Sequence, residues 1–278
     1  MAGRLGIIAG RGKYPAAVAR SARDQGVEVK VVAFYDETDE EWVKNYDTTW
    51  LRVGQLGRML RVLEDGGVAE VIMAGQIRPA NLFELRPDWK ALMLLARLKE
   101  RNAASIFGAI ADELEARGIK VLPATRYVEH WLAKSGHCAG PIPKERTLED
   151  LRYGFQIAKK ISEWKIGQAV VVKQGTVLAV EAFEGTDPMI RRGAELGKRK
   201  GCVLVKVSEP NQDMRFDVPV VGERTVELAR EYGVTAIGVE AGKTLIIDPP
   251  AVERLCESYR VTLWGMESPS ALGAELSS

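Results

Sequence analysis

The chain has 278 residues, of which 46% are hydrophobic and 28% are charged. These proportions are those of a folded protein and exclude a disordered one. Lys and Arg number 39 and Asp and Glu 38, giving a net charge of +1, whereas a general nucleic-acid binder is expected to carry a clear basic excess.

Residue types also argue against several kinds of site. Cys138, Cys202 and Cys256 form no CxxC pair, and His130 and His137 have no ligands at metal spacing, so neither a disulfide framework nor a structural zinc site is expected. No apolar run approaches the roughly 18 residues that span a bilayer. The N-terminus lacks the layout of a signal peptide. We therefore expect a soluble, cytoplasmic protein.

In the first half of the chain, strands and helices are predicted to alternate. Strands are predicted over residues 5–9, 27–34, 70–74 and 119–122, and helices over 15–25, 89–99 and 106–117. This alternation is typical of βαβ units around a parallel sheet. We expect a Rossmann-like N-terminal domain over residues 1–140, ending in a Gly- and Pro-rich linker at 136–146.

The second half begins with a predicted helix at residues 148–163. Strands at 169–173 and 177–183 follow, joined by a hairpin turn at Gln174 and Gly175. Helices are then predicted at 188–200 and 225–232, and strands at 203–207, 218–221, 236–239 and 244–247. These elements predict a C-terminal mixed α/β domain over residues 141–278, so the fold class is α/β.

A glycine loop, Gly10-Arg11-Gly12, lies between the first strand and the first helix, where a phosphate-binding turn is expected. Pro15 replaces the third glycine of the dinucleotide fingerprint, and Asp36 lies near the place of its acidic residue. A nucleotide-type ligand near this loop is favoured over a tight turn without a ligand. An NAD-linked oxidoreductase is a weaker alternative.

Two polar clusters of the second half fit phosphoryl chemistry. One is Glu184-Gly185-Thr186-Asp187 at the head of a predicted helix, and the other spans Lys206 to Asp217. Carboxylates are the oxygen ligands that Mg²⁺ prefers, and Lys or Arg neutralises phosphate charge that shifts in the transition state. The alternative is a pair of solvated loops with helix caps and surface ion pairs.

Five segments, in the correct order, resemble the LpxI-type UDP-2,3-diacylglucosamine pyrophosphatases: residues 5–12, 75–79, 180–191, 206 with 212–222, and 238–242. The resemblance implies an Mg²⁺-dependent enzyme of lipid A biosynthesis that hydrolyses UDP-2,3-diacylglucosamine to UMP and 2,3-diacylglucosamine 1-phosphate. It also implies a homodimer whose two domains hold the lipid nucleotide between them. A lipid product suggests peripheral contact with the cytoplasmic face of the inner membrane.

The resemblance places the family's essential aspartate at Asp217. We predict Asp217, Asp187 and Asp213 as catalytic residues, with Asp217 and Asp213 as metal ligands. The predicted substrate-binding residues are Gly10, Gly12, Gly75, Gln76, Glu184, Thr186, Lys206, Gln212 and Arg215. A non-catalytic nucleotide- or lipid-binding sensor or carrier is the alternative function.

Two acyl chains require an apolar surface, because each buried CH₂ contributes about 0.8 kcal/mol. Phe83, Leu85, Trp89, Met93 and Leu94 form one candidate face. The alternative is that this stripe is helix core.

Overall fold

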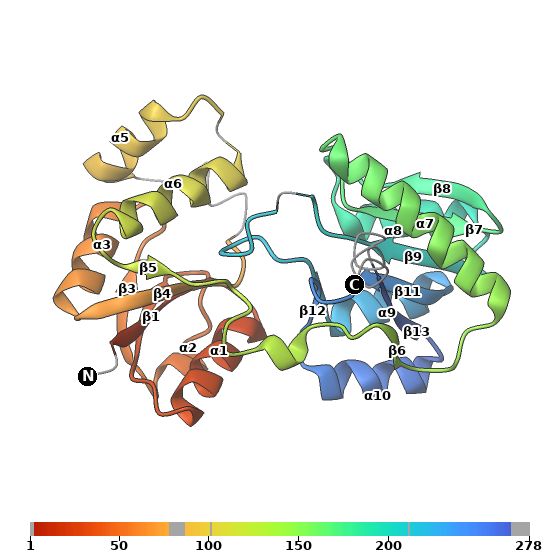
Figure 1. The fold of residues 1–278 in the computed structure, drawn as a ribbon, viewed down its shortest axis with the longest axis horizontal. Coiled ribbons are helices and arrows are strands. Elements are labelled where there is room, and N and C mark those ends of the chain that lie inside the picture. Colours follow the sequence, from red (N-terminus) through yellow and green to blue (C-terminus); the bar gives the residue numbers. More distant parts are fainter. Residues whose placement is uncertain (1–2, 78–86, 101, 211, 268–278) are drawn as a thin grey trace, which may run out of the picture. The chain divides into compact units, whose positions relative to one another are not determined.

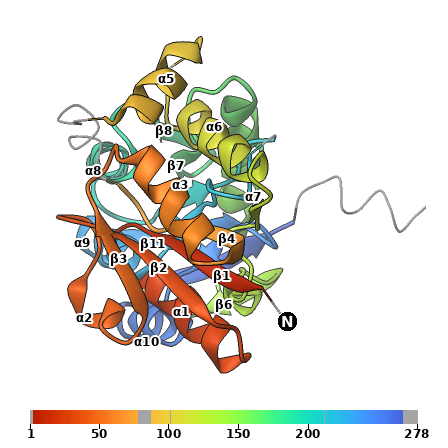
Figure 2. The ribbon, with the colours of Figure 1, turned by 90° about the vertical axis from the view of Figure 1, so that its left-hand side faces the viewer.

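The computed structural model describes residues 3–77, 87–100, 102–210 and 212–267 (Figures 1 and 2). The chain forms two compact units. Unit 1 comprises Met1–Glu129 and the short segment Asp213–Asp217, and unit 2 comprises His130–Gln212 and Val218–Ser278. The chain therefore passes from one unit to the other at three points.

Unit 1 contains a five-stranded sheet with the order β3-β2-β1-β4-β5. Its strands are β1 (Arg4–Ala9), β2 (Val29–Phe34), β3 (Asp47–Leu51), β4 (Val68–Ala74) and β5 (Lys120–Val121), and every neighbouring pair is parallel. This is the order of the first five strands of a Rossmann fold, in which ligands bind at the crevice beside the first strand.

The helices of unit 1 cover both faces of this sheet (Figure 1). They are α1 (Lys13–Asp24), α2 (Glu40–Val43), α3 (Leu56–Asp65), α5 (Trp89–Arg97) and α6 (Ala103–Glu115). Every residue of β2 is buried, as expected for a strand covered on both faces. The apolar stripe of α3, which includes Leu56, Leu60 and Leu63, packs into the core against the sheet.

Unit 2 contains a mixed sheet with the order β6-β13-β11-β9-β7-β8, and a two-stranded sheet of β10 and β12. The strands are β6 (Gly136–Ala139), β7 (Ala169–Lys173), β8 (Thr176–Val180), β9 (Cys202–Lys206), β10 (Val220–Val221), β11 (Val234–Glu240), β12 (Leu245–Ile246) and β13 (Thr262–Met266). The central strands β9, β11 and β13 are parallel to one another, and β6, β7 and β8 run antiparallel to their neighbours.

Helices also cover both faces of this sheet. The core on one face contains residues of α8 (Thr186–Leu196), α9 (Glu223–Tyr232) and α10 (Pro249–Tyr259). The core on the other face contains Leu151, Phe155 and Ala158 of α7 (Glu145–Glu163). Within the described residues, no helix combines the length and apolar character needed to cross a bilayer.

The predicted α/β class is confirmed. The hairpin at Gln174 and Gly175 also forms, with φ of +52° and +72°, the positive values that a tight two-residue turn requires.

Three expectations differ from the structure. Residues 136–139 of the expected linker form β6, which pairs with β13, so the units divide at Glu129/His130 rather than at 140/141. The segment Asp213–Asp217 belongs to unit 1 rather than to the C-terminal unit. The elements β3, α3, α10 and β13 were not predicted.

Candidate functional site

The glycine loop packs against the end of the neighbouring strand β4. The amide of Gly10 donates to Ala74 O at 2.7 Å, and the amide of Arg11 donates to Gln76 O at 2.8 Å. A Cβ at Gly10 would lie 2.5 Å from Gln76 O, and one at Gly75 would lie 2.6 Å from Arg11 O. The contact of the two strand ends therefore requires both glycines, whether or not a ligand approaches them.

Gly12 is the N-cap residue of α1 and has a positive φ of +94°. No side-chain hydrogen bond caps this helix, and no acidic residue lies in its first turn. Its first amides therefore remain available for an anion. Beside the loop, the Arg11 guanidinium lies 3.6 Å from the buried carboxylate of Glu37.

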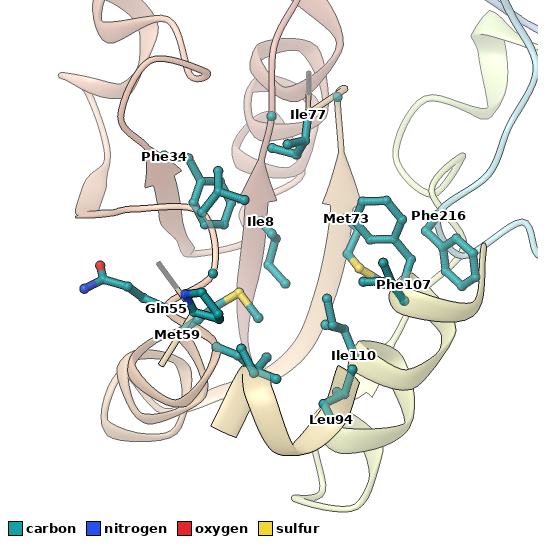
Figure 3. A pocket seen from close by; sticks show the side chains of 18 of the residues that line it. Ile8, Phe34, Gln55, Met59, Met73, Ile77, Leu94, Phe107, Ile110 and Phe216 are labelled. Carbon is teal, nitrogen blue, oxygen red and sulfur yellow. The ribbon is translucent and has the colours of Figure 1, made fainter. Parts of the chain in front are cut away.

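An apolar cavity of about 730 Å³ opens beside this loop in unit 1 (Figure 3). Gly10, Gly75 and Gln76 line it at the strand ends, and among the described lining residues only Gln55 and Gln76 have polar side chains. Its volume lies within the range of small-molecule pockets, roughly 300–1,000 Å³. The apolar walls include Ile8, Phe34, Met59, Met73, Ile110 and Phe216.

The segment Asp213–Asp217 brings part of the second predicted polar cluster to this cavity. Phe216 lines the cavity and packs against Phe107 of α6, with 5.9 Å between the ring centroids (Figure 3). The amide of Ala124 donates to Met214 O at 2.7 Å. The half-buried Asp217 directly follows Phe216. Gly10, Gly75, Gln76 and Phe216 therefore line one cavity in unit 1, and Asp217 adjoins it in sequence.

Arg215 holds Asp213 within this segment. Its Nη2 lies 2.7 Å from Asp213 Oδ2, its Nε donates to Oδ1 at 3.0 Å, and its Nη1 donates to Glu115 at 3.0 Å. These hydrogen bonds lower the pKa of Asp213 and raise that of Arg215. Because both oxygens of Asp213 accept from Arg215, Asp213 could bind a cation only by giving up one of these hydrogen bonds.

An Mg²⁺ site requires several oxygen ligands within reach of one ion. Across the described ranges, no group of three or more His, Cys, Asp or Glu side chains is placed to hold a metal ion. Mg²⁺ commonly binds through one or two carboxylates together with substrate phosphates and waters. The described residues therefore form no cage made by the protein alone, and a cation bound here would need substrate oxygens or waters as further ligands.

Gln212 precedes the segment and lies in unit 2. Its Oε1 accepts from the Glu209 amide at 2.9 Å. Its Nε2 is buried and has no hydrogen-bond partner among the described residues. A buried donor without a partner costs free energy, which is consistent with a role in binding an acceptor such as a phosphate oxygen.

In unit 2, Thr186 and Lys206 meet at the N-terminus of α8. Thr186 Oγ1 donates to Glu181 at 2.5 Å and accepts from Lys206 Nζ at 3.2 Å. Gly185 precedes the helix with φ of +82°, and no side-chain hydrogen bond caps it. A lysine beside an uncapped helix N-terminus attracts anions, and the first turn of α8 also carries the carboxylate of Asp187.

The other two members of this predicted cluster form ion pairs. Glu184 pairs with Arg192 at 2.5 Å, and this hydrogen bond lowers the pKa of Glu184. Asp187 lies 3.6 Å from Arg224. Within unit 2 the structure thus joins Thr186 and Lys206 by a hydrogen bond, whereas Glu184 and Asp187 pair with arginines. In unit 1 it joins Asp213 to Arg215, and Phe216 of the same segment lines the cavity beside the glycine loop.

Sequence reasoning missed Glu240 as part of a polar network. Its side chain is 1% exposed at the end of β11, and it accepts from the amide and hydroxyl of Ser208 at 2.9 and 2.7 Å. Lys159 and Lys243 lie 3.1 and 3.0 Å away. Burial opposes its charge, but the hydrogen bonds from Ser208 and the two lysines lower its pKa to about 2.

Two signals in the sequence pointed to Glu240 and Glu181. Glu240 is a carboxylate at the end of an otherwise apolar strand, and such a group needs partners when it is buried. Glu181, which accepts a hydrogen bond from Thr186, lies in one of the segments that carry the family resemblance.

Of the predicted apolar face, Trp89 and Met93 are exposed and Leu94 is buried, whereas Phe83 and Leu85 lie outside the described residues.

Comparisons with known proteins cover almost the whole chain. Residues 4–131 match the family model described as the LpxI N-terminal domain, and residues 134–264 match the LpxI C-terminal domain. A curated relative from Caulobacter vibrioides, UDP-2,3-diacylglucosamine pyrophosphatase LpxI, is 28% identical over 95% of this chain and 98% of its own length.

Similarity to solved structures is remote. CobK precorrin-6A reductase is 14% identical with a TM-score of 0.31, over 96% of this chain and 88% of its own. A biotin carboxylase domain from Hydrogenobacter thermophilus is 15% identical with a TM-score of 0.27, over 63% of this chain and 35% of its own. Scores this low support no conclusion about fold or function.

Proposed function

Since the chain belongs to the LpxI family, we propose that it hydrolyses the pyrophosphate bond of UDP-2,3-diacylglucosamine to UMP and 2,3-diacylglucosamine 1-phosphate. The observation that carries the proposal is the apolar cavity of unit 1. Its rim contains the glycine loop at Gly10 and the residue that precedes Asp217. Such a cavity suits acyl chains and offers few polar partners to a nucleobase.

In the proposed reaction, a water oxygen attacks the phosphorus on the sugar side of the diphosphate. The bond from that phosphorus to the bridging oxygen breaks, and the bridging oxygen leaves as part of UMP. The water proton passes to solvent through the carboxylates of the site. A bound divalent cation supplies electrostatic stabilisation of the phosphate oxygens.

The residues of the chain divide the remaining tasks. Asp217 is proposed to contact the reacting centre and to hold the cation, and Asp213 can join it only when Arg215 releases a carboxylate oxygen. Lys206, Thr186 and Gln212 are proposed to donate to phosphate oxygens, and Asp187 to act in catalysis. Glu184 and Arg215 are proposed to assist substrate binding by holding the side chains of Arg192 and Asp213 in place.

The test is release of UMP from UDP-2,3-diacylglucosamine dispersed in detergent micelles with Mg²⁺, measured with and without EDTA. We expect turnover that EDTA abolishes and that Asp217→Asn reduces by about 10² to 10⁴, the usual contribution of one positioned acid–base or electrostatic group. Asp65→Asn removes an exposed carboxylate of the same unit and serves as the matched control.

Each function predicts a different result. Normal turnover by a correctly folded Asp217→Asn variant would contradict the role of Asp217. Tight binding of the lipid nucleotide without UMP release would favour the non-catalytic sensor or carrier. A cytoplasmic homodimer is proposed together with the activity, and light scattering of the purified protein tests its oligomeric state.

A further inference from the structure

Helix α5 is apolar on two opposite faces. Its inner face lines the cavity of unit 1 through Ala91, Leu94 and Leu95. Its outer face carries Trp89 and, three, four and seven residues later, Leu92, Met93 and Ala96; all four are exposed. A helix that is apolar all round is normally buried in a protein core or in a membrane.

This outer face lies on the outside of unit 1. Both ribbon views place α5 at the end of the helical layer that it forms with α3 and α6 (Figures 1 and 2). Trp89 is 76% exposed, Leu92 46% and Met93 38%. Large apolar side chains grouped on one stripe, unlike single exposed ones, indicate an interaction surface.

Positive charge accompanies the stripe. Arg97 is the last residue of α5 and Lys99 lies two residues beyond it; both are exposed, and the structure shows neither in an ion pair with any described residue. The nearby carboxylate of Asp88 points inward, where it accepts from the amides of Gly57 and Ala91 at 2.7 and 2.9 Å. The exposed Glu100 follows Lys99, so two cations and one carboxylate lie beside the C-terminal end of the apolar face, with a net charge of +1.

We propose that this face, defined by Trp89, Leu92, Met93, Arg97 and Lys99, docks on the surface of an anionic lipid bilayer. Trp prefers the boundary between headgroups and acyl chains, and Leu and Met enter the acyl region. Arg and Lys attract anionic lipid phosphates. The face of one nine-residue helix is small compared with the roughly 800 Å² per partner of a stable protein interface, which favours a bilayer over a second copy of the chain.

The inference rests on the proposed function, because a diacylated substrate resides in a bilayer. One side of α5 would contact lipid and the other side lines the cavity proposed to receive the acyl chains. Docking would bring the cavity to the surface that holds its ligand, so an acyl chain would leave the bilayer with little exposure to water. Each CH₂ group that stays out of water lowers the free-energy cost of this transfer.

The test is co-sedimentation of the full-length protein with vesicles of phosphatidylethanolamine and phosphatidylglycerol, without substrate. The variant Trp89→Gln/Leu92→Gln/Met93→Gln should bind at least tenfold more weakly than the unmodified protein. Trp164→Gln, which removes a tryptophan 70% exposed on unit 2, is the matched control and should bind normally. Circular dichroism confirms that each variant is folded.

The charged part of the face is tested separately. Arg97→Gln/Lys99→Gln should weaken binding by about fivefold per cation, since each basic residue near an anionic surface is worth about 1 kcal/mol. Lys144→Gln/Arg146→Gln makes the same change in net charge on unit 2 and should have little effect. Vesicles of phosphatidylcholine alone should bind the unmodified protein weakly.

Equal vesicle binding by the triple variant and the Trp164→Gln control would overturn the inference. So would loss of self-association in the triple variant with vesicle binding unchanged, because the face would then join two copies. Turnover in detergent micelles separates this inference from the proposed function. Vesicle binding without UMP release refutes only the function, and UMP release without vesicle binding refutes only the docking.

Discussion

Replacing Glu240 by Gln should destabilise unit 2 strongly. The carboxylate is 1% exposed and joins the end of β11 to Ser208, which follows β9. The introduced glutamine would retain a hydrogen-bonding side chain of nearly the same size. The substitution therefore removes the charge that Lys159 and Lys243 face, while leaving the packing largely intact.

The magnitude follows from the pKa of Glu240, which lies at about 2 in the folded chain against an ordinary value of 4.5. At about 1.4 kcal/mol per pH unit, this difference corresponds to about 3 kcal/mol in favour of the folded state. Because the folded pKa is the lower one, the stabilisation is complete above about pH 5 and is lost as the pH falls through 4.5 toward 2.

The measurement is urea-dependent hydrogen exchange of peptides from β9 and β11, which reports unit 2 alone. The free energy of unfolding of the variant should lie about 3 kcal/mol below that of the unmodified protein at pH 7, and the gap should be less than half as large at pH 3. Glu163→Gln breaks an exposed pair with Lys160 and should cost no more than about 1 kcal/mol. A gap that does not change with pH would refute the electrostatic reasoning.

Three further predictions concern other contacts. Phe216→Ala removes a cavity wall and the contact with Phe107, so KM for the diacylated substrate should rise about tenfold while circular dichroism stays unchanged. Gly10→Ala places a Cβ 2.5 Å from Gln76 O and should lower the melting temperature through a loss of about 1–3 kcal/mol. The amides of the hairpin residues Gln174 and Gly175 donate to the carboxylate of Asp150. Asp150→Ala leaves both amides without this partner, which should lower the free energy of unfolding in urea by about 1–3 kcal/mol.

Each of these predictions has a contradicting result. An unchanged KM for Phe216→Ala would remove the cavity from substrate binding. An unaltered melting temperature for Gly10→Ala would show that the strand ends separate easily. The hairpin prediction fails if Asp150→Ala unfolds at the same urea concentration as Asp150→Glu, which keeps a carboxylate near the turn.

The local patterns that were predicted correctly are those in which a short stretch of sequence specifies its own conformation. Gln174 and Gly175 form the expected turn between β7 and β8, and the apolar runs of β1, β2 and β9 are strands. Elements with weaker patterns were missed. The edge strand β3 is half exposed and polar at its start, and the N-cap residue of α3, Gln55, makes no side-chain capping hydrogen bond.

Sequence alone determined the α/β class and the family, because hydrophobic periodicity and motif order are properties of neighbouring residues. Tertiary structure alone decided that Asp213–Asp217 returns to unit 1, through Phe216 on Phe107 and Arg215 on Glu115. It also decided which side of α5 faces the cavity and which faces outward. Contacts between residues a hundred positions apart depend on how helices and strands pack, and no local pattern in the chain records that packing.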